Sequence, residues 1–151
     1  MTVADLVDAP DGYRVMIRRS KTDQEGEGQE IAIPRGYRIR PVEHVQAWLA
    51  AAGITDGPLF RAVLKGGRLQ AVPLTPHSAA QIVKTYAKRA GLDPASFAGH
   101  SLRAGFLTSA AESGASIFKM MDQSRHKSVD TLRSYIRRAD LFREHAGAAF
   151  L

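Results

Sequence analysis

Helical segments with well-marked ends constrain the fold of this chain more than any other feature. Thr75 followed by Pro76 is a typical helix start, because a threonine side chain caps the first backbone amides and proline fits the first helical position. Gly91 is a typical helix end. Between them, apolar residues recur at helical spacing at Ile82, Val83, Tyr86, Ala87 and Ala90. We therefore predict a helix over residues 76–90.

Four more segments carry helical signals. The apolar stripe Val45, Trp48, Leu49 and Ala52 ends at Gly53. Residues 99–113 are rich in alanine and leucine and stop at Gly114, and a shorter helix is predicted over residues 116–123. Ser128 is expected to cap a last helix, with Asp130 in its first turn complementing the positive helix end. That helix is predicted to carry Leu132, Tyr135 and Ile136 inward.

Strand signals are concentrated near the amino end. Over residues 13–20, Tyr13, Val15 and Ile17 alternate with Arg14, Met16 and Arg18, which predicts a half-buried strand. Residues 30–34 alternate again after a polar, glycine-bearing stretch. The two segments predict a β-hairpin with Lys21 at the start of its turn. Residues 59–73 predict a long loop or a small second hairpin with a basic tip. The fold class is therefore α+β: a mostly α-helical domain with a small antiparallel sheet.

Length, charge and cysteine content limit the classes of function that this chain could have. A chain of 151 residues with 44% apolar residues fits a single domain over residues 1–151. The net charge of +6 favours a polyanionic partner such as nucleic acid, although a solvated basic surface explains it equally well. The absence of cysteine excludes disulfides and thiolate chemistry and favours the cytoplasm. We expect no membrane span, because no apolar run is long enough.

Two pairs of residues could act on a phosphate. His100 and Arg103 are three apart, so on a helix both project from one face, while Leu102 between them is expected to point toward the core. Arginine can hold two phosphate oxygens and histidine can move a proton near neutral pH. His126 and Tyr135, nine residues apart, are expected to converge on one cleft. Taken separately, each pair fits a solvated helix face or an ordinary core tyrosine equally well.

Read together and in order, these residues resemble the tyrosine recombinase family, which is also called the phage integrase family. Ser20-Lys21-Thr22-Asp23 resembles its hairpin lysine, His100-Ser101-Leu102-Arg103 resembles its HxLR box, and the segment from Arg125 to Tyr135 resembles its closing His-to-Tyr box. The resemblance spans nearly the whole chain. It implies site-specific recombination of double-stranded DNA by a homo-oligomer, a tetramer in the synapse.

The resemblance also implies a role for each residue, without a metal, ATP or another cofactor. Tyr135 would attack the scissile phosphorus and form a 3′-phosphotyrosyl link. Arg103, His100 and His126 would hold the non-bridging oxygens, and His100 could accept the tyrosine proton. Lys21 would protonate the leaving 5′ oxygen. Arg125 and Lys127 are candidates for contacts with DNA phosphates, or for a solvated basic turn.

The chain departs from the family pattern in two respects. It lacks the family's earlier arginine and its amino-terminal DNA-clamping domain, so we expect an amino-terminally truncated catalytic domain with weak or no activity by itself. Ser124-Arg125 stands where relatives often have Leu-Gly. Two alternatives stay open: a type IB topoisomerase, and a non-catalytic or degenerate DNA-binding fragment of an integrase.

Overall fold

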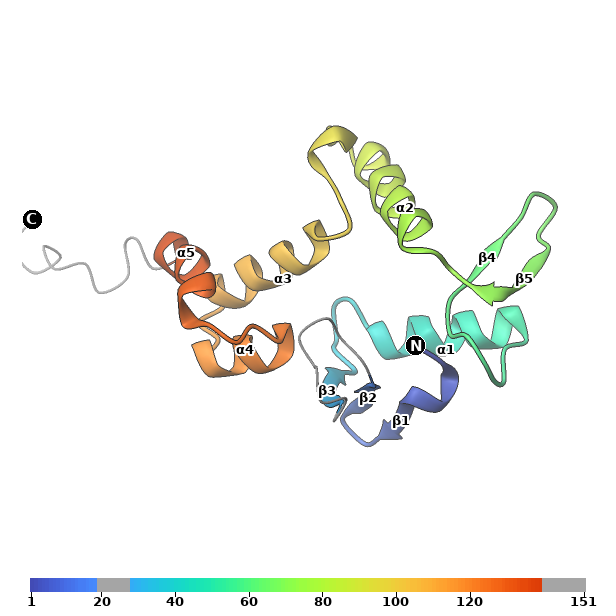
Figure 1. Cartoon of the computed structure of the whole chain (residues 1–151), viewed down its shortest axis with the longest axis horizontal. Helices are drawn as coiled ribbons and strands as arrows, with labels where there is room; N and C mark the ends of the chain where they lie inside the picture. The colour runs from blue at the N-terminus through green and yellow to red at the C-terminus, as the bar shows by residue number, and fades with distance from the viewer. Residues whose placement is uncertain (19–27, 140–151) are drawn as a thin grey trace, which may run out of the picture. The chain divides into compact units, whose positions relative to one another are not determined.

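The computed structural model describes residues 1–18 and 28–139, and of residues 137–139 it describes the backbone alone. The chain forms two compact units, Met1–Ser78 and a second that begins at Ala79 (Figure 1). The predicted fold class is confirmed: the described residues form five α-helices and two small antiparallel sheets. Whether residues 1–151 act as one domain stays a prediction. No helix among the described residues is long and apolar enough to cross a membrane.

An antiparallel three-stranded sheet forms the centre of the first unit. Its strands are β1 (Leu6–Ala9), β2 (Gly12–Ile17) and β3 (Gln29–Pro34), in that order across the sheet. Val15 of β2 lies opposite Leu6 on one side and Ile31 on the other, so apolar side chains share one face. The predicted pairing of β2 with β3 is confirmed. Strand β1 was not predicted, because four residues that include Asp8 show too little alternation.

Helix α1 (Pro41–Ala52) packs on this sheet and completes its core. Val42 is fully buried with Tyr13 and Val15, and the partly buried residues packed against them are Leu6, Ile31, Ile33 and Val45. The helix begins earlier than its apolar stripe indicates, since proline at the first position favours helix initiation. It ends as predicted at Gly53, whose φ of 59° lies in the left-handed region.

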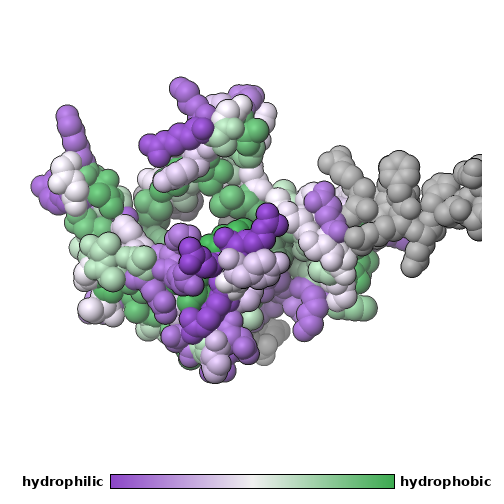
Figure 2. All heavy atoms as spheres, turned by 180° about the vertical axis from the view of Figure 1, so that it is seen from behind, coloured by the Kyte–Doolittle hydropathy of each residue, from purple (hydrophilic) through white to green (hydrophobic). Residues whose placement is uncertain are grey.

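The segment after Leu59 forms the small second hairpin, so the loop alternative is wrong. Strands β4 (Arg61–Val63) and β5 (Leu69–Pro73) are antiparallel. Gly66 and Gly67 both have φ near +80° at the tip, a conformation that few residues other than glycine adopt. The hairpin shows hydrophilic residues at its tip and apolar residues along its sides (Figure 2).

Asp5 is a buried carboxylate just before β1. It accepts hydrogen bonds from Arg18 Nε at 2.5 Å and from the backbone amide and hydroxyl of Thr2 at 2.7 and 3.0 Å. The hydrogen bond from Arg18, followed by that from the Thr2 amide, lowers the pKa of Asp5 to about 2. Arg18 is the last described residue of the β2 segment, so this ion pair joins the end of that segment to the amino terminus of the chain.

We expect this ion pair to make the folded state sensitive to strong acid. Because the folded-state pKa of Asp5 lies below its ordinary value of 3.8, its stabilising contribution is present above pH 4 and is lost as the pH falls toward 2. Urea unfolding between pH 2 and pH 7 should show Asp5→Asn less stable than the unsubstituted protein at neutral pH, with the difference shrinking in acid. A difference that stays constant with pH would contradict this prediction, and Asp11→Asn, at an exposed position, is the control.

Helix α2 (Pro76–Arg89) begins and ends as predicted. The Thr75 hydroxyl accepts a hydrogen bond from the Ser78 amide at 3.1 Å, and Gly91, with a φ of 77°, follows the helix. The predicted apolar stripe is only partly buried: Ala87 is buried, whereas Tyr86 is exposed and lies beneath the Arg89 guanidinium.

Three helices form the main core of the second unit: α3 (Ser101–Glu112), α4 (Ile117–Ser124) and α5 (Val129–Ala139). The predicted Ser128 cap is confirmed, since Ser128 accepts a hydrogen bond from the Asp130 amide. Ser116 caps α4 in the same way and accepts a hydrogen bond from the Lys119 amide. The buried cluster consists of Leu107, Ala111, Met120 and Leu132, with Tyr135 and Ile136 packed against it.

The expected inward direction of Leu102 is wrong, because its side chain is 69% exposed. The face of α3 that packs on α4 and α5 is instead defined by Leu107 and Ala111. Leu102 is five residues before Leu107, which at 100° per residue places it well around the helix from that face. Residue type alone did not show which leucine of α3 packs inward.

This difference predicts two distinct mutational effects. Leu132→Ala should lower the free energy of unfolding by about 2–3 kcal/mol, because it removes a fully buried side chain from a small cluster that can partly close around the cavity. Leu102→Ala should change it by less than about 0.5 kcal/mol. Chemical denaturation of both variants measures the two values. Equal losses would show that the inward face of α3 is incorrectly placed.

Candidate functional site

His100 and Arg103 lie at the start of α3. His100 is the N-cap residue and is exposed, and its backbone carbonyl accepts a hydrogen bond from the Ala104 amide at 3.0 Å. The guanidinium Nη2 of Arg103 donates a hydrogen bond to the backbone carbonyl of Ser124, the last residue of α4. Carbonyls at a helix end have no partner within the helix, so this one is available to an arginine. The contact uses one of five guanidinium donors and leaves others for a ligand.

Ser124 also contacts His126, which follows it by two residues. The Ser124 side chain is buried, and its hydroxyl oxygen lies 2.7 Å from Nδ1 of His126 and 2.5 Å from the carbonyl oxygen of Met120. Arg103 and His126 are thus held on two sides of one residue, although 23 positions separate them in the chain. No role was predicted for Ser124, and the one sequence signal at this residue is its position two residues before His126.

His126 titrates below its ordinary range. Burial, and after it the positive charge of Arg103, lower the pKa of His126 from its usual value of 6.5. Both effects act against the imidazolium form. The ring is therefore mostly neutral at neutral pH, and one nitrogen carries a hydrogen while the other carries a lone pair.

The turn between α4 and α5 holds the basic residues of the closing motif. Arg125, the residue just after α4, has a φ of 60°, in the left-handed region where glycine is the usual residue. Its amide donates a hydrogen bond to the Met121 carbonyl at 2.6 Å. Arg125 stands where relatives often have glycine, and its backbone adopts the left-handed conformation that glycine would adopt there. Arg125 is half-buried and Lys127 is exposed. Their contacts with DNA stay predictions.

Tyr135 lies on α5, one turn after the fully buried Leu132. Its side chain is half-buried and packs against the α3–α4–α5 cluster. The prediction that this helix carries Leu132, Tyr135 and Ile136 inward is confirmed. The convergence of Tyr135 and His126 on one cleft stays a prediction. Lys21 and the tail after Ala139 lie outside the described residues.

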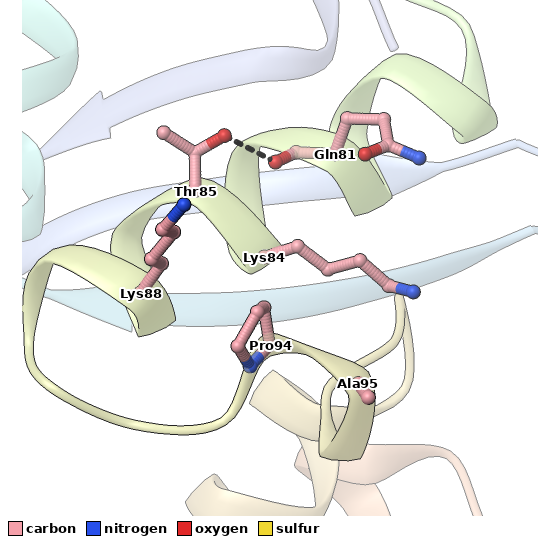
Figure 3. Close-up of a pocket in the computed structure, with 6 residues that line it drawn as sticks. All are labelled: Gln81, Lys84, Thr85, Lys88, Pro94 and Ala95. Carbon is pink, nitrogen blue, oxygen red and sulfur yellow. Dashed lines mark hydrogen bonds between the residues drawn. The ribbon is translucent and has the colours of Figure 1, made fainter.

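A separate pocket of about 320 Å³ lies beside α2. Figure 3 shows its lining residues, which come from α2 and from the short 3-10 turn Pro94–Ser96. The Thr85 hydroxyl donates a hydrogen bond to the Gln81 carbonyl at 2.8 Å. The positive charge of the pocket comes from two lysines one turn apart, Lys84 and Lys88. These lysines add a cationic surface to the second unit.

Comparisons with known proteins identify the family of this chain. The model of the phage integrase family matches residues 1–141. A relative, the integrase/recombinase xerD homolog of Selenomonas ruminantium, is 41% identical over 144 residues, which cover 94% of this chain and 42% of the relative.

Two crystal structures of the XerH site-specific recombinase share the fold. A post-cleavage complex with palindromic difH substrate has a TM-score of 0.70 and 16% identity, and the match covers 97% of this chain and 39% of that chain. A pre-cleavage complex with difH has a TM-score of 0.65 and 19% identity, and the match covers 92% and 38% of the two chains. This chain thus spans less than half the length of each of these proteins.

The family assignment rests on the sequence comparisons, and the structural likeness supports the fold. The family model covers nearly the whole chain, and the relative at 41% identity is matched over almost all of it. The chain therefore belongs to the phage integrase family of tyrosine recombinases.

Proposed function

We propose that the protein cuts and rejoins double-stranded DNA at specific sites, with Tyr135 as the nucleophile. The observation that carries this proposal is the joint contact of Arg103 and His126 with Ser124. It brings a phosphate-binding guanidinium and a proton-transferring imidazole together on the helical cluster against which Tyr135 packs. Family membership and the likeness to recombinases bound to DNA substrates support the same reading.

The proposed reaction is a transesterification. The Tyr135 hydroxyl oxygen attacks the phosphorus, the bond to the 5′ oxygen breaks, and a 3′-phosphotyrosyl link forms. The tyrosine proton passes to a base, for which His100 is the candidate, and Lys21 supplies a proton to the leaving oxygen. The number of phosphate ester bonds is conserved, so rejoining by the reverse reaction needs no ATP.

Charge stabilisation falls to Arg103, His100 and His126. The remaining guanidinium donors of Arg103 would bind non-bridging oxygens as negative charge builds in the pentavalent transition state. His100, exposed at the start of the same helix, would add a second donor. These groups need no metal ion for this role.

DNA is proposed to bind through phosphate contacts as well as at the reacting phosphorus. Arg125 and Lys127 in the turn before α5, and Lys84 and Lys88 on α2, are candidates for these contacts. A homo-oligomer on DNA, a tetramer in the synapse, is proposed from the family. Binding by electrostatic contacts should weaken steeply as salt concentration rises.

Covalent trapping tests the proposal. The full-length protein, meaning the product of the whole reading frame that encodes this chain, is incubated with nicked DNA that carries its attachment site. The cleaved strand end then diffuses away and rejoining is blocked. We expect a protein–DNA adduct on a denaturing gel, and peptide mapping that locates the nucleotide on Tyr135. The same assay on the 151-residue chain tests whether these residues are active by themselves.

The same assay separates the alternatives. Adducts that form without site preference, together with relaxation of supercoiled plasmid by a monomer, would support a type IB topoisomerase. DNA binding without an adduct at any native site would support a non-catalytic integrase fragment. A nucleotide attached to another residue would overturn the assignment of Tyr135.

A further inference from the structure

The Ser124 hydroxyl has one hydrogen and two close neighbours. Its oxygen lies 2.5 Å from the carbonyl oxygen of Met120, four residues earlier in α4, and 2.7 Å from Nδ1 of His126. A carbonyl oxygen can only accept a hydrogen bond, and two oxygens approach this closely only with a hydrogen between them. The Ser124 hydrogen is therefore directed to Met120, as in the common serine-to-carbonyl bond within helices.

The remaining lone pairs of the hydroxyl oxygen determine the hydrogen position on the histidine. Because Ser124 Oγ acts as the acceptor toward His126, Nδ1 must be the donor and carry the hydrogen. The neutral imidazole then has its lone pair on Nε2. We propose that Ser124 is a positioning residue that holds His126 as the Nδ1–H tautomer and leaves Nε2 for substrate; the substrate role rests on the function proposed above.

One further contact, the burial of Ser124 and the pKa of His126 make this arrangement specific. The backbone carbonyl of Ser124 accepts the hydrogen bond from Arg103, so one residue orients both the guanidinium and the imidazole. Ser124 is only 5% exposed, which limits competition from water for its hydroxyl. Burial and the Arg103 charge also lower the pKa of His126, which keeps the ring neutral in the free protein.

The proposed tautomer has a consequence for the reaction. A neutral Nδ1–H imidazole accepts a hydrogen at Nε2 and cannot donate one there. In the free protein, His126 is therefore ready to take up a proton, and it can donate a hydrogen bond to a phosphate oxygen only after protonation. A bound phosphate favours that protonation because its negative charge stabilises the imidazolium.

Nitrogen NMR measures the tautomer directly. The chain is labelled with ¹⁵N-histidine, and long-range proton–nitrogen spectra are recorded above the pKa of His126, with the His126 signals identified by their loss in His126→Asn. We expect hydrogen on Nδ1 in the unsubstituted protein and in Ser124→Thr, which retains the hydroxyl. Ser124→Ala should shift the ring toward the Nε2–H form, and Ser109→Ala, an exposed serine of α3, should not.

These experiments distinguish a failure of the tautomer proposal from a failure of the proposed function. Hydrogen on Nε2 in the unsubstituted protein would overturn the inference, whatever the protein does to DNA. In the full-length protein, Ser124→Ala should lower the rate of adduct formation by up to about a hundredfold with little change in the Kd for DNA, and Ser124→Thr should restore the rate. A shifted tautomer with an unchanged rate would overturn the positioning role. Absence of an adduct from the unsubstituted protein would instead count against the proposed function.

Discussion

Tyr135→Phe in the full-length protein is expected to eliminate the covalent protein–DNA adduct. The substitution removes the only atom that could form the phosphotyrosyl bond, the hydroxyl oxygen, and keeps the aromatic ring that packs against the α3–α4–α5 cluster. Stability and DNA affinity should therefore stay close to those of the unsubstituted protein. The measurement combines denaturing-gel trapping on nicked attachment-site DNA with a Kd from electrophoretic mobility.

A matched control distinguishes loss of the nucleophile from a general effect of removing a tyrosine hydroxyl. Tyr37 is 90% exposed between β3 and α1, so Tyr37→Phe changes the same group at a position outside the proposed site. It should leave adduct formation unchanged. An adduct that persists in Tyr135→Phe would show that another side chain attacks the phosphorus.

Arg103→Lys is expected to reduce the rate of adduct formation by about a hundredfold to a thousandfold. Lysine retains the charge but loses the planar fork, so one ammonium group cannot hold both the Ser124 carbonyl and the oxygens of a phosphate. The loss should fall on the rate at saturating DNA more than on the Kd, because the contact strengthens as charge builds in the transition state. Single-turnover cleavage at several protein concentrations separates the two.

Arg14→Lys is the control for this substitution. Arg14 is an exposed residue of β2 that forms a 3.9 Å ion pair with Glu30, so the same chemical change there should leave cleavage unaffected. Circular dichroism of both variants checks the fold. If Arg103→Lys weakens DNA binding and leaves the saturated rate intact, Arg103 contacts DNA without stabilising the transition state.

Much of the fold could be predicted because its signals are local. Capping residues marked the start of α2 at Thr75 and Pro76 and its end at Gly91, and alternation identified β2 and β3. Both depend on the chemistry of residues a few positions apart. The candidate site residues His100, Arg103, His126 and Tyr135 were identified by the resemblance of their order to the family pattern, because each pair alone also fits a solvated helix face or a core tyrosine.

Other features depend on residues far apart in the chain. Strand β1 was missed because its stability comes from pairing with β2, and a four-residue segment shows little periodicity of its own. Leu102 and Leu107 are the same residue type on one helix, and packing against Met120 and Leu132 selected Leu107 for the core. The hydrophobicity of leucine predicts that it prefers burial, but the packing of the neighbouring helices determines which face of α3 is buried.

The amino-acid sequence alone thus determined the family, most of the helix ends and the candidate site residues, because these follow from residue identity, spacing and resemblance to the family pattern. The tertiary structure determined how Ser124 positions two of those residues, Arg103 and His126. Arg103 and Ser124 are 21 positions apart, and α3 and α4 must pack together before the guanidinium can reach the carbonyl at the end of α4. The hydroxyl of Ser124 orients His126 only when α4 ends at that residue, because its hydrogen bond to Met120 requires the helix and its contact with Nδ1 requires the turn.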